Sequence, residues 1–281
     1  MVSTGIEPPR VYDSAQVRPP VLTEFRNLWA YRGLLRLLVA RDITVRYKRS
    51  LLGVWWTLLN PLLTAGVLWL VFSQLLRFEL PSDEPYIVYV LSGLLVITFF
   101  QQGVVQVGNS IVGSASVLSK VYVPAEVFSL AAASAAAVNF LLSLVPLLVI
   151  QLALGYGIPW TVVLVPIPAL ALLGLAAGVG LIVASAAVHF YDVIDLTGVV
   201  VQLIAYLTPG FYPISIVPES YRPLMKLNPL YHYLLVFRGF VYGGEFAPLL
   251  SFVVMGVTSL AALALGVWVF SRSWRNAAAL L

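Results

Sequence analysis

Long apolar runs constrain this chain more than any other feature of its sequence. Six segments each exceed the roughly 18 apolar residues that predict a membrane-spanning helix. The predicted spans are residues 54–76, 87–107, 127–153, 160–186, 196–217 and 248–270. Of the 281 residues, 60% are hydrophobic and 10% are charged, whereas about 25% are charged in a soluble domain. We therefore expect an all-α, polytopic membrane protein with six transmembrane helices.

The distribution of lysine and arginine predicts the orientation of these helices. Nine of the 16 cationic residues precede the first predicted span, whereas the segment 77–86 between spans one and two has one arginine and three acids. Because cytoplasmic flanks are enriched in lysine and arginine, we expect both termini in the cytoplasm. Six spans are an even number, as this orientation requires.

The chain is expected to have three parts. Residues 1–27 are polar and contain four prolines, which predicts an extended cytosolic tail. Residues 28–52 are predicted to form an amphipathic interface helix on the cytosolic membrane surface, and residues 53–281 the transmembrane domain. The charged candidates of the interface helix are Arg36, Arg41, Asp42, Arg46, Lys48 and Arg49. Their cations could bind anionic membrane lipid or the pyrophosphate of a polyprenyl carrier; nucleic acid is not an expected partner.

The segment 208–240 does not fit one long helix. It contains five prolines, at positions 209, 213, 218, 223 and 229, and proline breaks a helix interior. Its many leucines are nevertheless too apolar for a free loop. We expect short re-entrant or interfacial helices on the external side, since broken backbone at membrane depth must be buried in protein or line a cavity. A hydrophobic loop on the bilayer surface is the alternative.

Within the fourth span, Gly174 and Gly178 have the GxxxG spacing. Small residues at this spacing let two membrane helices approach closely. We interpret this pair as a packing site.

The sequence offers little chemistry for an enzyme. No Asp, Glu, Lys, Arg or His falls inside the six predicted spans, there is no cysteine, and no cluster has metal-ligand spacing. Asp192 and Asp195 form the closest acidic pair, and we expect solvated charges at a helix end. A proton- or sodium-driven carrier usually needs an ionisable residue in the membrane. The chain also lacks a P-loop, so we expect it to bind no cofactor and to take its energy from another subunit.

Three stretches, taken together and in order, resemble the ABC-2 type permease family. The first motif is LLRLLVARDITVRYKRSLLGVWWTLLNPL (34–62), the second is NSIVGSASVLSKVYVPAEVFSL (109–130), and the third is TPGFYPISIVPESYRPLMKLNPL (208–230). Within this family the chain looks most like the membrane subunits that export O-antigen, teichoic acid and, in mycobacteria, lipid-linked galactan. The resemblance runs from about residue 28 to the C-terminus.

The resemblance implies a homodimer of two six-span subunits, with two separate ATPase subunits on the cytosolic face that bind ATP and Mg. It implies that the first motif is the interface helix, the third motif forms the short external helices, and the second motif is a coupling helix seated in the ATPase. The coupling candidates are Val117, Leu118, Lys120, Val121, Tyr122, Pro124 and Glu126. An apolar ridge suits insertion into a partner's groove; a loop resting on lipid is the alternative. Ser119 and Ala125 stand where family members often have basic residues.

The predicted function is that of a permease subunit in the bacterial plasma membrane, part of an ATP-driven exporter of a lipid-linked polysaccharide. Because sugars stack on aromatic faces, the candidates for the translocation path are Trp56, Tyr206, Phe211 and Tyr212. Anchoring at the membrane interface is the alternative for these aromatic residues. Two other functions stay open: an ABC-2 permease for a small lipophile or drug, and a membrane-embedded transferase acting on lipid-linked sugars.

Overall fold

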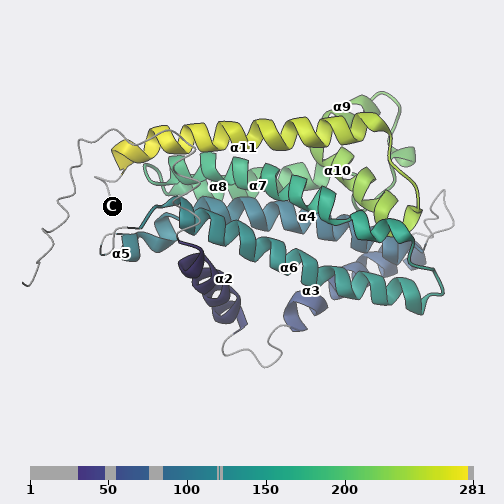
Figure 1. Ribbon diagram of the computed structural model, residues 1–281. Helices are drawn as coiled ribbons and strands as arrows, with labels where there is room; N and C mark the ends of the chain where they lie inside the picture. Colours follow the sequence, from purple (N-terminus) through teal and green to yellow (C-terminus); the bar gives the residue numbers. More distant parts are fainter. Residues whose placement is uncertain (1–30, 48–54, 76–84, 119, 121–122, 278–281) are drawn as a thin grey trace, which may run out of the picture.

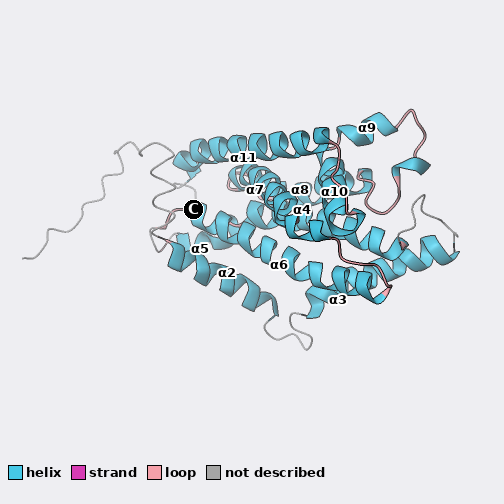
Figure 2. Cartoon of the chain, turned by 45° about the vertical axis from the view of Figure 1, so that its right-hand side comes forward, coloured by secondary structure: helices cyan, strands magenta, loops and turns pink. Residues whose placement is uncertain are grey.

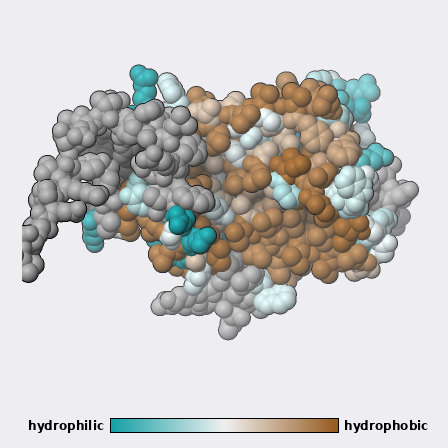
Figure 3. Space-filling model, viewed as in Figure 1, coloured by the Kyte–Doolittle hydropathy of each residue, from teal (hydrophilic) through white to brown (hydrophobic). Residues whose placement is uncertain are grey.

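Long helices lie side by side in a bundle in the computed structural model (Figure 1). It describes residues 31–47, 55–75, 85–118, 120 and 123–277, and none of these is in a strand. The long helices are α3 (Trp55–Trp69, continued by the π-helix η1, Leu70–Leu75), α4 (Tyr86–Asn109), α6 (Glu126–Ala153), α7 (Pro166–Ala187, preceded by the 3₁₀-helix η3, Trp160–Leu164) and α11 (Leu249–Ala277). These five are long and apolar enough to cross a membrane. Their surface in Figure 3 is largely hydrophobic along the helices.

The predicted fifth span differs from the structure at both ends. In place of a helix over 196–217, the helix α8 runs from Asp192 to Leu207 and has 16 residues. It is about 24 Å long, which is less than the roughly 30 Å of a bilayer core. Thr208 ends it in an extended conformation, with ψ 128°, because the following Pro209 disfavours the helical region for its predecessor. Five of the six predicted spans are confirmed as long apolar helices, and the fifth, 196–217, is not.

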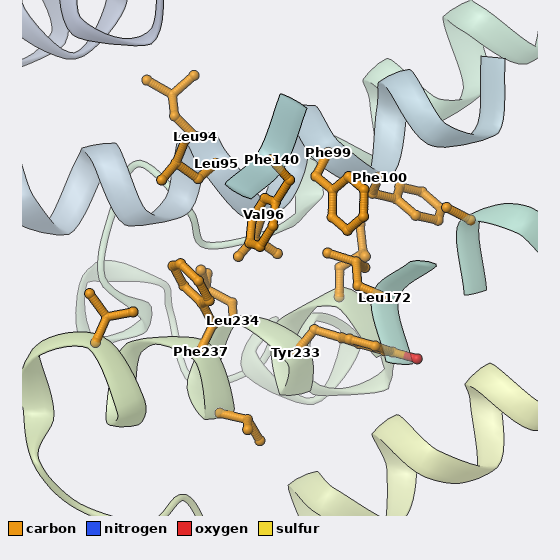
Figure 4. Close-up of a cluster of buried hydrophobic side chains, with 14 of the residues drawn as sticks. Leu94, Leu95, Val96, Phe99, Phe100, Phe140, Leu172, Tyr233, Leu234 and Phe237 are labelled. Carbon is orange, nitrogen blue, oxygen red and sulfur yellow. The ribbon is translucent and has the colours of Figure 1, made fainter. Parts of the chain in front are cut away.

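Helix α4 is the centre of the bundle. It contacts α3, α6, α7, α8 and α10, and residues on all of its faces are buried. Figure 4 shows Phe140 of α6 between Phe99 of α4 and Phe237 of α10. The ring centroids of Phe99 and Phe140 are 4.6 Å apart, and those of Phe140 and Phe237 are 5.7 Å apart. A helix that is apolar all round is typical of a protein core or a membrane span, and α4 lies at the centre of this bundle.

Helices α7 and α11 pack closely through glycines. A Cβ on Gly174 would overlap the hydroxyl of Ser259, and a Cβ on Gly178 would overlap the backbone of Ala262. A Cβ on Gly266 of α11 would in turn overlap the carbonyl of Gly178. The packing role predicted for the GxxxG pair is therefore confirmed.

The proline-rich segment forms short helices, as predicted. They are η4 (Ile214–Ile216), α9 (Arg222–Leu227), α10 (Pro229–Arg238) and the π-helix η5 (Gly239–Gly243). Figure 2 shows the loop that leads into α9, and Asn228 alone separates α9 from α10. Helix α10 contacts α4, α7 and α11, and Tyr233, Val236 and Phe237 are almost completely buried. Asn228 caps α10, because its Oδ1 accepts a hydrogen bond from the N–H of Leu230 at 3.1 Å.

Candidate functional site

The predicted interface helix is present as α2 (Arg32–Tyr47), which lies obliquely to the bundle in Figure 1. It packs on the first turns of α6, where Leu38 is buried together with Val127, Phe128 and Ala131. One face of α2 is therefore held by protein. The opposite, charged side is the part available to lipid, a carrier or a partner subunit.

The charges of α2 are only partly within the described residues. Arg36 is exposed. Arg41 donates through Nε and Nη2 to Asp42 Oδ1 at 3.1 and 3.0 Å, an exposed pair worth under about 1 kcal/mol. Both line a groove of about 650 Å³ between α2, α4 and α6. The side chain of Arg46, together with Lys48 and Arg49, lies outside the described residues.

The second motif forms a tight turn at the end of the bundle, away from α9 (Figures 1 and 2). It consists of the 3₁₀-helix η2 (Val112–Ser114) and the short helix α5 (Ala115–Leu118) between α4 and α6. Its base is fixed, because Ile111 and Ala125 are completely buried in a cluster with Phe270 of α11. Val117 is 38% exposed, and Lys120 is exposed. The turn thus presents a small apolar and cationic tip on a rigid base.

The remaining coupling candidates lie around this tip. Leu118 is half-buried against the Leu38 cluster, so the structure brings the first and second motifs into contact. Pro124 is half-buried, and Glu126 is in the first turn of α6, where an acid is favourable. Val121 and Tyr122 lie outside the described residues. Sequence reasoning had not predicted the contact between the two motifs.

Three of the four path candidates lie together near the beginning of α4. Tyr86 donates to the carbonyl of Phe211 at 2.7 Å, and Tyr89 donates to that of Tyr212 at 3.0 Å. The hydroxyl of Tyr212 donates in turn to the carbonyl of Tyr206 at 3.0 Å.

Trp56 lies apart from the other three. It lines a cavity of about 500 Å³ between α3, α4 and α6, where Thr98 and Gln102 face it from α4. Residues 98 and 102 are three to four turns along α4 from Tyr86, or roughly 18–24 Å. The structure thus places the aromatic candidates at two separate levels, and their role in the path stays a prediction.

A buried cation that sequence reasoning missed holds the third motif. Arg238, only 9% exposed, donates to Ser92 Oγ at 3.1 Å and to the carbonyls of Pro209, Tyr89 and Gly210 at 3.2, 3.0 and 2.8 Å. Its guanidinium carbon is 3.6 Å from the centroid of the Tyr89 ring. Arg238 thereby joins α10, α4 and the turn after α8. A lone arginine in an apolar stretch was the signal that could have found it.

The acidic pair on α8 behaves as predicted. Asp192 and Asp195 occupy its first turn and are exposed. Among the described residues, no three histidines or acids gather into a metal-binding group. The geometry assembles an apolar bundle with the exposed tip of the second motif at one end and the turn held by Arg238 at the other.

Comparison with known proteins shows the family of this chain. A family model described as "ABC-2 type transporter" matches residues 33–242. A relative from Myxococcus xanthus, named "O-antigen export system permease protein RfbA", is 35% identical over 219 residues, which cover 77% of this chain and 83% of the relative. Two relatives from Klebsiella pneumoniae with the same name are 28% and 24% identical over 222 and 220 residues, each covering 78% of this chain and 83% of the relative.

Proposed function

This chain belongs to the ABC-2 type transporter family, and we propose that it is the membrane subunit of an ATP-driven exporter of a lipid-linked polysaccharide. Family membership makes it a transport subunit. The substrate is proposed from the Myxococcus xanthus relative, whose printed name is that of an O-antigen export permease and which matches over 83% of its length. The ATPase is a separate subunit, which would bind ATP and Mg.

The observation that carries the proposal is the geometry of the second motif. A tip built for docking needs an exposed apolar residue and a base that moves with the bundle. Val117 is exposed at the tip, while Ile111 and Ala125 anchor the base among α4, α6, α7 and α11. Because packed interiors transmit displacement rather than absorb it, a push on α5 would be passed to the long helices.

We propose that the working unit is a homodimer. Helices α3 and α8 both contact α4, and both are mostly exposed, with Leu63, Val67, Leu196, Val199 and Leu203 among their exposed side chains. A second copy covering this side would enclose a path between the subunits. Since the chain has no cysteine, single Leu63→Cys and Leu203→Cys variants would report only on the introduced thiol, and an oxidised dimer band is expected at one of them.

The orientation proposed for the chain places both termini and α5 in the cytoplasm and α9 and α10 on the external side of the bacterial plasma membrane. The cations that precede the first span support this orientation. So does the position of α5 and α9 at opposite ends of the bundle (Figure 1).

Co-purification tests the main proposal. We expect the tagged chain to retain a stoichiometric ABC ATPase. We also expect deletion of the gene for this chain to remove the polysaccharide from the cell surface, while the polysaccharide accumulates inside the cell. If the chain purifies without any ATPase and deletion leaves the surface polysaccharide unchanged, the proposal is wrong.

We also propose that the cations of the predicted interface helix bind the pyrophosphate of the lipid carrier. The test neutralises Arg36, Arg41, Arg46 and Lys48 together, and measures both export and binding to anionic vesicles. Loss of vesicle binding with intact export would show that these residues serve bulk lipid alone.

A further inference from the structure

The cavity that Trp56 lines is built from matched polar pairs. Each of three helices contributes two polar residues at i, i+4 spacing, which places both on the same face of that helix. The pairs are Asn60 and Thr64 on α3, Thr98 and Gln102 on α4, and Asn139 and Ser143 on α6. Convergence of three polar faces on one cavity of about 500 Å³ is costly in a membrane helix bundle, and such groups usually mark a functional site.

The hydrogen bonds already made here define what the cavity offers a ligand. The hydroxyls of Thr64, Thr98 and Ser143 donate to carbonyls of their own helices, at 3.0, 2.6 and 2.9 Å. Each hydroxyl oxygen therefore keeps acceptor capacity. The carboxamide of Gln102 has no hydrogen-bond partner among the described residues, and it offers both donors and an acceptor.

The absence of charge in the cavity restricts the class of ligand that it can bind. None of the residues that line the cavity is ionisable. A phosphate or carboxylate entering it would lose its hydration without gaining a counter-charge, which is strongly unfavourable. Neutral hydroxyls, which both donate and accept, match the lining. The indole of Trp56 and the ring of Phe140 add apolar faces against which the C–H face of a sugar ring can lie.

We propose that this cavity binds neutral, hydroxyl-rich sugar residues within a single subunit. The inference rests on the proposed function, because it assigns a subsite to the carbohydrate part of the exported substrate. The volume is in the range of small-molecule sites. Burial of Asn139 and Ser143, at 6% and 8% exposure, fixes one wall, while the exposed Asn60 and Gln102 line the accessible side.

A polar stripe leads from the α2 end of the bundle to this cavity. Gln106 and Asn109 follow Gln102 on the same face of α4 and line the groove beside α2. That groove contains the Arg41–Asp42 pair, whereas the cavity is neutral. The division suits an amphiphile whose anionic link stays near α2 while its neutral sugars occupy the cavity.

Saturation-transfer NMR on the full chain tests the site. The chain is placed in lipid nanodiscs, because detergents with sugar headgroups would compete with the probes for the cavity. The probes are maltose and lactose, with a uronic-acid disaccharide of the same size as the charged comparison. We expect signals from the neutral disaccharides and weaker ones from the uronate. Gln102→Leu should reduce the neutral signal about fivefold, as loss of a hydrogen bond predicts. Gln202→Leu, which removes an exposed carboxamide on α8 that binds Tyr206, should leave it unchanged.

The variants are compared only if their elution and melting profiles match the wild type; Ser143→Ala, with the same expected direction, serves if Gln102→Leu does not fold. The inference is overturned by absence of signal from both neutral disaccharides, by a stronger uronate signal, or by equal signals in the Gln102 and Gln202 variants. Co-purification of the ATPase is scored separately. Retained ATPase without sugar signals refutes the cavity alone, and sugar signals without ATPase refute the proposed function alone.

Discussion

Replacing Arg238 by methionine tests how the turn after α8 is held in place. Methionine keeps much of the apolar volume of the side chain, so α10 should stay packed in the core. The change removes four hydrogen bonds and the contact with the Tyr89 ring. Among the described residues, Arg238 is the sole donor to the carbonyl of Gly210.

The expected cost follows from these contacts. A buried carbonyl left without a donor costs about 1–3 kcal/mol, and loss of the cation–π contact adds about 1 kcal/mol. Removal of a buried charge recovers part of this, because the guanidinium no longer needs to be dehydrated. We expect a net loss of about 2 kcal/mol, which corresponds to a roughly thirtyfold increase in local opening. The increase in local opening should be confined to the turn whose carbonyls, at Pro209 and Gly210, accept hydrogen bonds from Arg238.

Hydrogen exchange measured by mass spectrometry on the peptide covering 206–213 is the assay. Arg222→Met is the matched control, because Arg222 also donates to two carbonyls, those of Val217 and Ser215, at 2.9 and 3.0 Å. Its side chain is 34% exposed, so water can replace these bonds, and we expect less than about 1 kcal/mol. Unchanged exchange in the Arg238 variant, or equal effects of both variants on 206–213, would refute the reasoning.

Three further predictions concern packing, capping and coupling. Gly178→Ala should destabilise the chain by about 2–4 kcal/mol in thermal melting through overpacking of α7 on α11, whereas Gly256→Ala, which meets open space, should not; equal melting temperatures would contradict this. Asn228→Ala should cost about 1–2 kcal/mol through loss of the α10 cap and of the bond that Nδ2 donates to Thr208 Oγ1. Asn228→Asp keeps the cap oxygen but not this donor, and should recover part of the loss; no recovery at all would exclude the cap as a cause. Val117→Glu should abolish ATPase co-purification without changing the melting temperature, whereas Ile216→Glu at the other end should not affect co-purification; retained ATPase in the Val117 variant would exclude α5 as the docking tip.

Local features were predictable where their cause is local. A helix in lipid satisfies its backbone groups within its own segment, so apolar length alone was enough to predict five long helices. The glycine spacing predicted close packing because it is also a local property: Gly174 and Gly178 lack Cβ atoms on one face of their own helix. The short helices of the third motif followed from the spacing of its prolines.

Other features depended on contacts between distant segments. The residues on both sides of Pro209 are apolar, so hydropathy extended the predicted fifth span to residue 217. Pro209 ends the helix at Leu207, but contacts with α4 and α10 determine where the following turn lies. The separation of Trp56 from Tyr206, Phe211 and Tyr212 also depended on the register of α4.

By itself the sequence determined that this chain is a helical membrane protein of the ABC-2 type, because apolar length, proline spacing and motif order are properties of the linear chain. Only the tertiary structure decided the clasp at Arg238 and the polar cavity between α3, α4 and α6. In each case a side chain acquires its role from partners many residues away: Arg238 binds Ser92 at a separation of 146 residues, and the three polar pairs face one another only when three helices pack. A polar residue in an apolar run signals that a partner is needed, and the fold determines which partner it meets.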